Sequence, residues 1–318
     1  MDFLSSFFTP EMISNGLRLT TPILFGAIAS ALSSRAGVLN LAIEAKMLIG
    51  AFVGLVVLAA TGSTLVAVIA AAFAGAVTGG LMAGAHRIGV DLIIFAIGLN
   101  MLFLELSVYL MRVFFGGTGV WNPDVETLSN IRIPLIADIP FIGIVFSGYN
   151  SLVYFTFFLA ILYGVLFRFR SGRHLLAVGE SPNAALSAGI SVNKVQAWSL
   201  VGAGAIAALG GAFLTVGELG LFARDMTEGA GWIAITAALL AMNRPIFIVP
   251  AALLFGFSDA VAIRLQSTTE LPNAIVQGLP MIATLIVLGV VGYRGLRAAQ
   301  TVGMPKKTRA RRLRARTA

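Results

Sequence analysis

The chain has 318 residues, of which 58% are hydrophobic types and only 11% are charged. A soluble globular domain carries roughly 25% charged residues, so 22 basic and 14 acidic side chains are too few to cover a water-facing surface. Together with a mean hydropathy of +0.93, this composition excludes a soluble enzyme, a disordered chain and a nucleic-acid-binding domain. The class that remains is a polytopic membrane protein.

Apolar runs of about 20 residues are long enough to cross a bilayer as helices. We predict an all-α bundle of about nine transmembrane helices, with eight to ten as the range. The seventh run is short, and we expect a half-helix or a re-entrant piece there, buried in protein. The nine runs lie near 17–33, 41–60, 64–85, 91–115, 150–167, 195–215, 230–242, 246–265 and 273–292.

The net charge of +8 comes from one segment. Nine Lys and Arg residues lie from Arg294 to the end and no acid follows Glu270, so subtracting nine from +8 leaves −1 for the rest. A basic run after a final span predicts a cytoplasmic C-terminus, and binding to membrane lipid is a second use that it allows. We expect a single transmembrane domain, 1–295, followed by a basic cytoplasmic tail, 296–318.

The charges of the loops predict the orientation of the bundle. The stretch 168–194 carries a net charge of +3, whereas 112–150 sums to −1 and 216–230 sums to −2. Because cationic loops stay inside, we place 168–194 in the cytoplasm and the two acidic loops outside. Counting spans from these loops puts the C-terminus inside and the N-terminus outside.

Motifs for chemistry within the chain are missing. The dipeptide Gly-Lys never occurs, so there is no GxxxxGK[ST] loop for ATP, and there is no HExxH motif. The chain has no cysteine and therefore no thiolate metal site. We expect neither an enzyme nor a cofactor in this chain, and no nucleic-acid partner.

Polar groups inside spans are costly and suggest function. In the stretch 35–52, Gly37 and Asn40 suit a break in a helix, and Glu44 and Lys46 follow where the helix resumes. A broken helix offers free backbone groups for a transport site. The alternative is that these charged residues only mark the cytoplasmic interface.

Asn100 lies about halfway through its span. An asparagine there hydrogen-bonds to another helix or to a polar ligand, and helix–helix contact is the commoner use. Our hypothesis is that Asn40, Glu44 and Asn100 line or support the substrate pathway.

The cytoplasmic stretch 171–198 is more than a solvated connector. Ser181 and Pro182 predict the start of a short helix, and Gly189 predicts its end. Small residues on such a helix would fit a groove on another protein. The residues that we assign to this docking contact are Gly179, Glu180, Ala184, Ala185, Ala188 and Gly189.

The segment GRHLLAVGESPNAALSAGISVNKVQAW resembles the cytoplasmic coupling loop of permease subunits of ABC importers, in the branch that includes ribose-type, branched-chain amino acid and nucleoside permeases. RAGVLNLAIEAKMLIGAF, GAIAALGGAFLTVGELGLF, GAGWIAITAALLAMNRPIFIVPAALLFGFSDAVAIRLQ and LPMIATLIVLGV are similar to that family in the same order, over about residues 15–295. The shorter of two paired nucleoside permeases is the most similar type.

This resemblance implies a bacterial-type inner-membrane importer for a nucleoside or a simple sugar. It implies a separate ATPase subunit that binds ATP, a second and longer permease subunit, and an extracytoplasmic substrate-binding protein or lipoprotein. The chain departs from the family at Ala42 and Ala45, where glycine is favoured, and at Lys46, where an apolar residue is favoured. Because these positions lie in the proposed pathway, the substrate stays open.

The competing hypothesis is an ion-coupled secondary transporter of a small polar solute. A carrier of this type would have several acidic residues or histidines at the middle of its membrane spans. This sequence has few, and Glu105 is the clearest of them. A membrane enzyme is a third class, for which we find no nucleophile or metal constellation.

Overall fold

A computed structural model describes residues 10–116, 119–134, 142–268, 278 and 282. Two compact units can be distinguished, Met1–Val261 and Ala262–Ala318. The candidate site lies within the first unit, and the predicted tail 296–318 lies outside the described residues.

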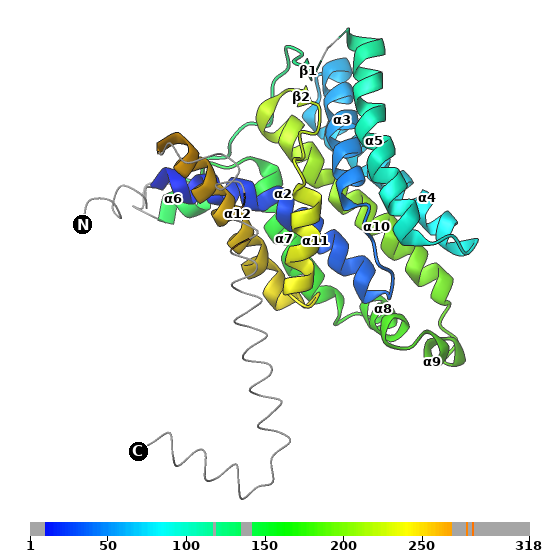
Figure 1. Cartoon of the computed structure of the whole chain (residues 1–318). Helices are drawn as coiled ribbons and strands as arrows, with labels where there is room; N and C mark the ends of the chain where they lie inside the picture. Colours follow the sequence, from blue (N-terminus) through cyan, green and yellow to red (C-terminus); the bar gives the residue numbers. More distant parts are fainter. Residues whose placement is uncertain (1–9, 117–118, 135–141, 269–277, 279–281, 283–318) are drawn as a thin grey trace, which may run out of the picture. The chain divides into compact units, whose positions relative to one another are not determined.

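The described chain is almost entirely helical, which confirms the predicted all-α class (Figure 1). Its only strands among the described residues form a two-residue antiparallel ribbon that pairs Val120 with Ala223 and Trp121 with Phe222. In chain order the elements are α2 (Pro10–Arg35), α3 (Ile43–Thr61), α4 (Thr64–Arg87), α5 (Leu92–Phe115), β1 (Val120–Trp121), α6 (Ile142–Phe146), α7 (Ser151–Leu166), α8 (Arg170–Glu180), α9 (Pro182–Ser187), α10 (Val192–Ala212), the π-helix η1 (Phe213–Leu219), β2 (Phe222–Ala223), α11 (Ala230–Leu240) and α12 (Pro245–Thr268).

The expected count of about nine spans is not confirmed. Within the described residues, six helices are long and apolar enough to cross a membrane, and α7 with α8 would make a seventh, although the two are bent by 74°. The predicted seventh run is the 11-residue helix α11, which is too short to span alone. The predicted run 273–292 falls almost entirely outside the described residues.

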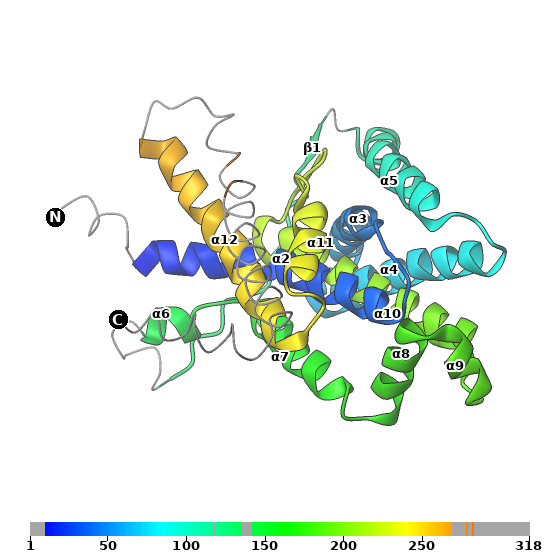
Figure 2. The same cartoon turned by 60° about the horizontal axis from the view of Figure 1, so that its bottom comes forward.

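Glycines let helix α10 lie directly against α3 and α4, which Figure 2 shows beside it. A Cβ on Gly211 would lie 1.7 Å from the carbonyl oxygen of Met47, and one on Gly75 would lie 2.2 Å from that of Gly204. Small residues allow this close approach of membrane helices, where van der Waals packing replaces hydrophobic burial as the source of stability. The dense run of small residues in 202–213 therefore serves the close packing of α10 against its neighbouring helices.

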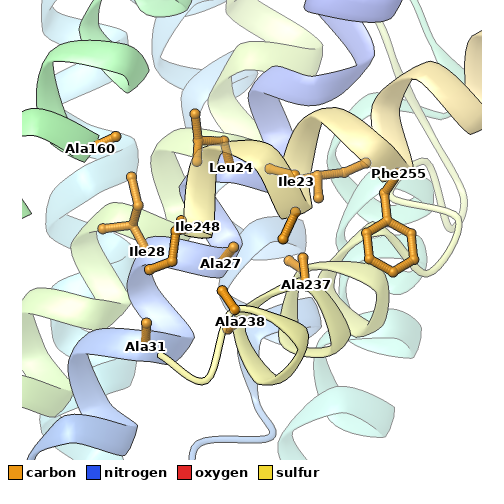
Figure 3. Packing of buried hydrophobic residues seen from close by; sticks show 14 of the residues in the cluster. Ile23, Leu24, Ala27, Ile28, Ala31, Ala160, Ala237, Ala238, Ile248 and Phe255 are labelled. Carbon is orange, nitrogen blue, oxygen red and sulfur yellow. The ribbon is translucent and has the colours of Figure 1, made fainter. Parts of the chain in front are cut away.

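A second core joins α2 to α7, α11 and α12 (Figure 3). Ala27 of α2 and Ala237 and Ala238 of α11 are fully buried in it, so the half-length helix α11 is held by alanine contacts. Ile248 and Phe255 of α12 close the same cluster. This core holds α11 against α2 and α12.

Candidate functional site

A non-helical segment lies at Gly37 and Asn40 as predicted, but it connects two helices that are each long and apolar enough to span a membrane and does not interrupt a single span. Helix α2 ends at Arg35, residues 36–42 are not helical, and α3 begins at Ile43. Gly37 has a φ of +77°, a left-handed conformation that glycine adopts without strain. We call residues 36–42 the α2–α3 break.

Asn100 of α5 closes the N-terminal end of α3. The residue before α3, Ala42, has no side chain that can cap the helix, so the first amides need acceptors from elsewhere. The Oδ1 atom of Asn100 accepts from the backbone N–H of Ala45 at 3.0 Å, and its Nδ2 donates to the carbonyl oxygen of Leu41 at 3.0 Å. Asn100 therefore performs the capping role from a neighbouring helix.

Asn40 and Lys46 form a buried pair beside the same helix start. The Nζ of Lys46 donates to Asn40 Oδ1 at 2.8 Å and lies 3.1 Å from the sulfur of Met82. Lys46 is fully buried, and within the described part of the chain it forms no ion pair. The Nδ2 of Asn40 has no partner there either. The sequence placed Lys46 in the proposed pathway as a departure from the family, but did not predict that it pairs with Asn40.

Glu44 binds the N-terminal end of α11. Its Oε1 accepts from the hydroxyl of Thr227 and, at 3.2 Å, from the backbone N–H of Gly229, while its Oε2 accepts from the N–H of Gly231 at 2.7 Å. Gly229, at the cap position of α11, has no side chain of its own to do this. A carboxylate at a helix N-terminus is also favoured by the helix dipole.

The close packing at this contact depends on a glycine. A Cβ on Gly231 would lie 2.5 Å from the backbone N of Glu44 and 2.6 Å from its Oε2. Sequence reasoning did not find Thr227, Gly229 or Gly231, because nothing in the local pattern links them to a residue more than 180 positions earlier.

The three proposed pathway residues thus come together at one place. Asn40 and Glu44 flank the start of α3, and Asn100 reaches it from α5. Each of them binds a helix end or the α2–α3 break, which gives all three a supporting role. Their part in the substrate pathway stays a prediction.

The stretch 168–194, which we expect to be cytoplasmic, holds the short helix that the sequence predicted. In α9, Pro182 occupies the first helical position, and the hydroxyl of Ser181 accepts from the N–H of Ala184 at 3.4 Å. Gly189 follows with a φ of +78°. The preceding amphipathic helix α8 was not predicted, although the buried positions Gly172, Leu175 and Val178 follow the spacing of one helix face.

Within this loop the proposed docking residues divide into two groups. Ala185 is buried against Val178 and Val192 of its own chain, so it supports the loop from within. Glu180, Ala184, Ala188 and Gly189 are exposed. A partner would therefore meet these exposed residues and not Ala185.

Gly179 connects the loop to the α2–α3 break. A Cβ on Gly179 would lie 2.2 Å from the carbonyl oxygen of Arg35 and 3.1 Å from the backbone N of Gly37. A second link comes from α10, where Gln196 Nε2 lies 3.4 Å from the carbonyl oxygen of Ala36. The loop, the break and the start of α3 are thus in continuous contact.

Comparison with known families gives a match that covers most of the chain. The family described as "Branched-chain amino acid transport system / permease component" matches residues 12–285. No solved structure matches.

Curated relatives are similar over nearly the same length. The nucleoside ABC transporter permease protein NupC of Lactococcus lactis is 30% identical over 292 residues, 88% of this chain and 91% of the relative. The guanosine permease NupQ of Bacillus subtilis is 29% identical over 287 residues, 85% of this chain and 89% of the relative. The glucose permease TsgB13 of Haloferax volcanii is 28% identical over 284 residues, 85% of this chain and 73% of the relative.

Proposed function

We propose, because this chain belongs to the family of permease components of branched-chain amino acid transport systems, that it forms the translocation pathway of an ABC importer for a nucleoside or a related simple sugar. The observation that carries the choice of cargo is the similarity, over at least 85% of the chain, to permeases named for nucleosides, guanosine and glucose. The chain is a transport subunit of a multi-pass membrane assembly and not an enzyme.

We propose three protein partners. A separate ATPase supplies the energy, because the sequence holds no Gly-Lys dipeptide and hence no phosphate-binding loop of that type. A second, longer permease subunit completes the pore, and an extracytoplasmic substrate-binding protein delivers the cargo. ATP is bound by the ATPase subunit, so this chain carries no cofactor.

The route for the energy begins at α9. An ATPase that binds the exposed residues of α9 moves it together with α8, because Ala185, Val178 and Val192 form one small apolar cluster. Gly179 of α8 is in backbone contact with Arg35. Since packed interfaces shift between discrete arrangements and do not deform continuously, a displacement of the loop reaches the α2–α3 break.

The route continues from the break into the membrane interior. Asn100 holds the first turn of α3, and Glu44 joins that turn to the N-terminal end of α11. Helix α11 is only 11 residues long, and half-helix ends at substrate sites are common in transporters. A movement of the break therefore changes the position of a half-helix inside the bundle.

The ion-coupled alternative loses its main residue. Glu105 pairs with Arg224 at 3.0 Å, and the two side chains are 65% and 59% exposed. Because Arg224 already pairs with this carboxylate, Glu105 is not a free acid that could take up a coupled ion.

The experiment that tests the cargo is uptake competition in proteoliposomes that contain the chain with its ATPase, second permease and binding protein. We expect unlabelled nucleosides, or a simple sugar, to compete with labelled guanosine or glucose. Competition by branched-chain amino acids alone would contradict the proposal.

The topology can be tested by cysteine labelling, because the natural chain contains no cysteine. We expect Asn183→Cys, in α9, to react with a membrane-impermeant maleimide only after the cells are opened. Glu126→Cys, in the acidic loop, should react in intact cells. Labelling of position 183 in intact cells would show that the orientation is reversed.

The docking of α9 can be tested with Ala184→Arg. A bulky cation at this exposed position should keep the ATPase from its contact, so we expect the ATPase to be lost during co-purification and uptake to fall about tenfold or more, equivalent to at least about 1.4 kcal/mol. Ser171→Arg is the matched control, since Ser171 is small, exposed and in the same loop. Equal ATPase recovery with both variants would place the contact elsewhere. Ala185→Arg is less informative, because that residue is buried in its own chain.

A further inference from the structure

A cavity of about 390 Å³ opens between the C-terminal end of α4 and the N-terminal end of α10. Its lining includes no residue of the α2–α3 break or of α9, although Ser191 follows α9 closely in the chain. The other lining residues that the argument uses are Ala83, His86, Arg87, Asn193, Lys194 and Trp198.

The cavity is positively charged. Arg87 and Lys194 are both exposed, and neither forms an ion pair with any carboxylate in the described ranges. His86 Nε2 lies 3.1 Å from Gln196 Oε1, which ties α4 to α10 at this point. Arg87 of α4 and Lys194 of α10 therefore line one cavity, and the contact between His86 and Gln196 holds the two helices together there. An anion would fit between the two cations.

The cavity also lies where a membrane surface is expected. Both α4 and the segment Val192–Leu219 are long and apolar enough to span a bilayer, so the ends that form the cavity lie at the boundary between lipid and water. Trp198 is 75% exposed and Ile88 is 79% exposed. Tryptophan is enriched at this boundary, and exposed apolar residues beside the cations suit acyl chains better than a soluble partner.

We propose that this cavity binds the phosphate headgroup of an anionic phospholipid in the leaflet that faces α8 and α9. Arg87 and Lys194 donate charge-assisted hydrogen bonds to the phosphodiester oxygens, and Trp198 lies against the upper part of an acyl chain. Basic pockets between membrane helices recognise headgroups by this combination of charge and depth. Because Gln196 also contacts Ala36 of the α2–α3 break, the bound lipid stabilises the end of α10 that meets the break.

The test is titration of the full-length chain in neutral detergent with phosphatidylglycerol, phosphatidylcholine or inorganic phosphate, followed by native mass spectrometry and thermal unfolding. We expect phosphatidylglycerol alone to bind and to raise the melting temperature. The double variant Arg87→Ala/Lys194→Ala should bind it roughly 30-fold more weakly, since each basic residue near an anionic surface contributes about a factor of five.

The matched control is Arg170→Ala/Arg173→Ala, which removes two exposed cations from α8 and should leave binding of phosphatidylglycerol within about twofold of the natural chain. If both double variants lost phosphatidylglycerol binding equally, the lipid would be held by general charge attraction and not by this cavity, which would overturn the proposal. An equal stabilisation by inorganic phosphate would assign the cavity to a free anion instead. Unchanged binding of phosphatidylglycerol by the Arg87→Ala/Lys194→Ala variant would also overturn the proposal.

Discussion

Replacement of Glu44 by alanine is expected to cost about 2–4 kcal/mol of stability and to reduce uptake more than tenfold. The carboxylate accepts from Thr227, Gly229 and Gly231, and alanine leaves these three donors at the end of α11 without an acceptor. A buried donor without a partner costs about 1–3 kcal/mol. Without these hydrogen bonds, the half-helix α11 will lose its fixed position relative to α3.

Thermal unfolding in detergent and uptake in proteoliposomes measure the two effects. Glu44→Gln keeps one acceptor oxygen and should be intermediate in both assays. The control is Glu126→Ala, which removes an exposed carboxylate from the loop that follows α5 and should change stability by less than about 0.5 kcal/mol. If Glu44→Ala unfolds and transports like Glu126→Ala, then Glu44 does not link α3 to α11.

The second large effect is expected from Gly179→Ala, which should separate ATP hydrolysis from transport. The added Cβ would lie 2.2 Å from the carbonyl oxygen of Arg35, so α8 must move away from the α2–α3 break. Such overpacking costs about 1–3 kcal/mol. We expect the ATPase to remain bound and to hydrolyse ATP, while uptake falls at least about tenfold, because the contact that transmits the movement is displaced.

Gly84→Ala is the matched control for this variant. Gly84 lies in helix α4, and a Cβ there meets nothing within 4 Å. The same substitution should therefore only stabilise the helix, by roughly 1 kcal/mol, because alanine has the higher helix propensity. The ratio of ATP hydrolysed to substrate transported is the measurement. A ratio unchanged in Gly179→Ala would show that the contact between α8 and the break does not carry the coupling.

Local sequence patterns predicted two parts of this site. Gly37 and Asn40 indicated a non-helical segment, which is the α2–α3 break, and Ser181, Pro182 and Gly189 predicted α9. These are local effects of backbone conformation and capping, which neighbouring residues determine. The glycine-rich stretch of α10 likewise indicated close helix packing.

The partners of these residues could not be predicted in the same way. Glu44 and Gly231 lie 187 positions apart, and Asn100 and Ala45 lie 55 apart, so only the tertiary fold brings them together. Ala184 and Ala185 look equivalent in sequence, yet one is exposed and the other is buried. The number of membrane spans could not be predicted from hydropathy alone. Helix α11 is apolar but short, and α7 and α8 are bent relative to each other, so neither forms a straight membrane-spanning helix.

We propose that transport through this chain is driven by ATP on a separate ATPase that binds α9, and not by an ion gradient. The most direct test is uptake of labelled nucleoside into proteoliposomes that hold the complete importer, with ATP supplied on the side of α9 or with only a proton or sodium gradient. We predict uptake that requires ATP and that ionophores do not affect. Uptake driven by an ion gradient in the absence of ATP would contradict the account.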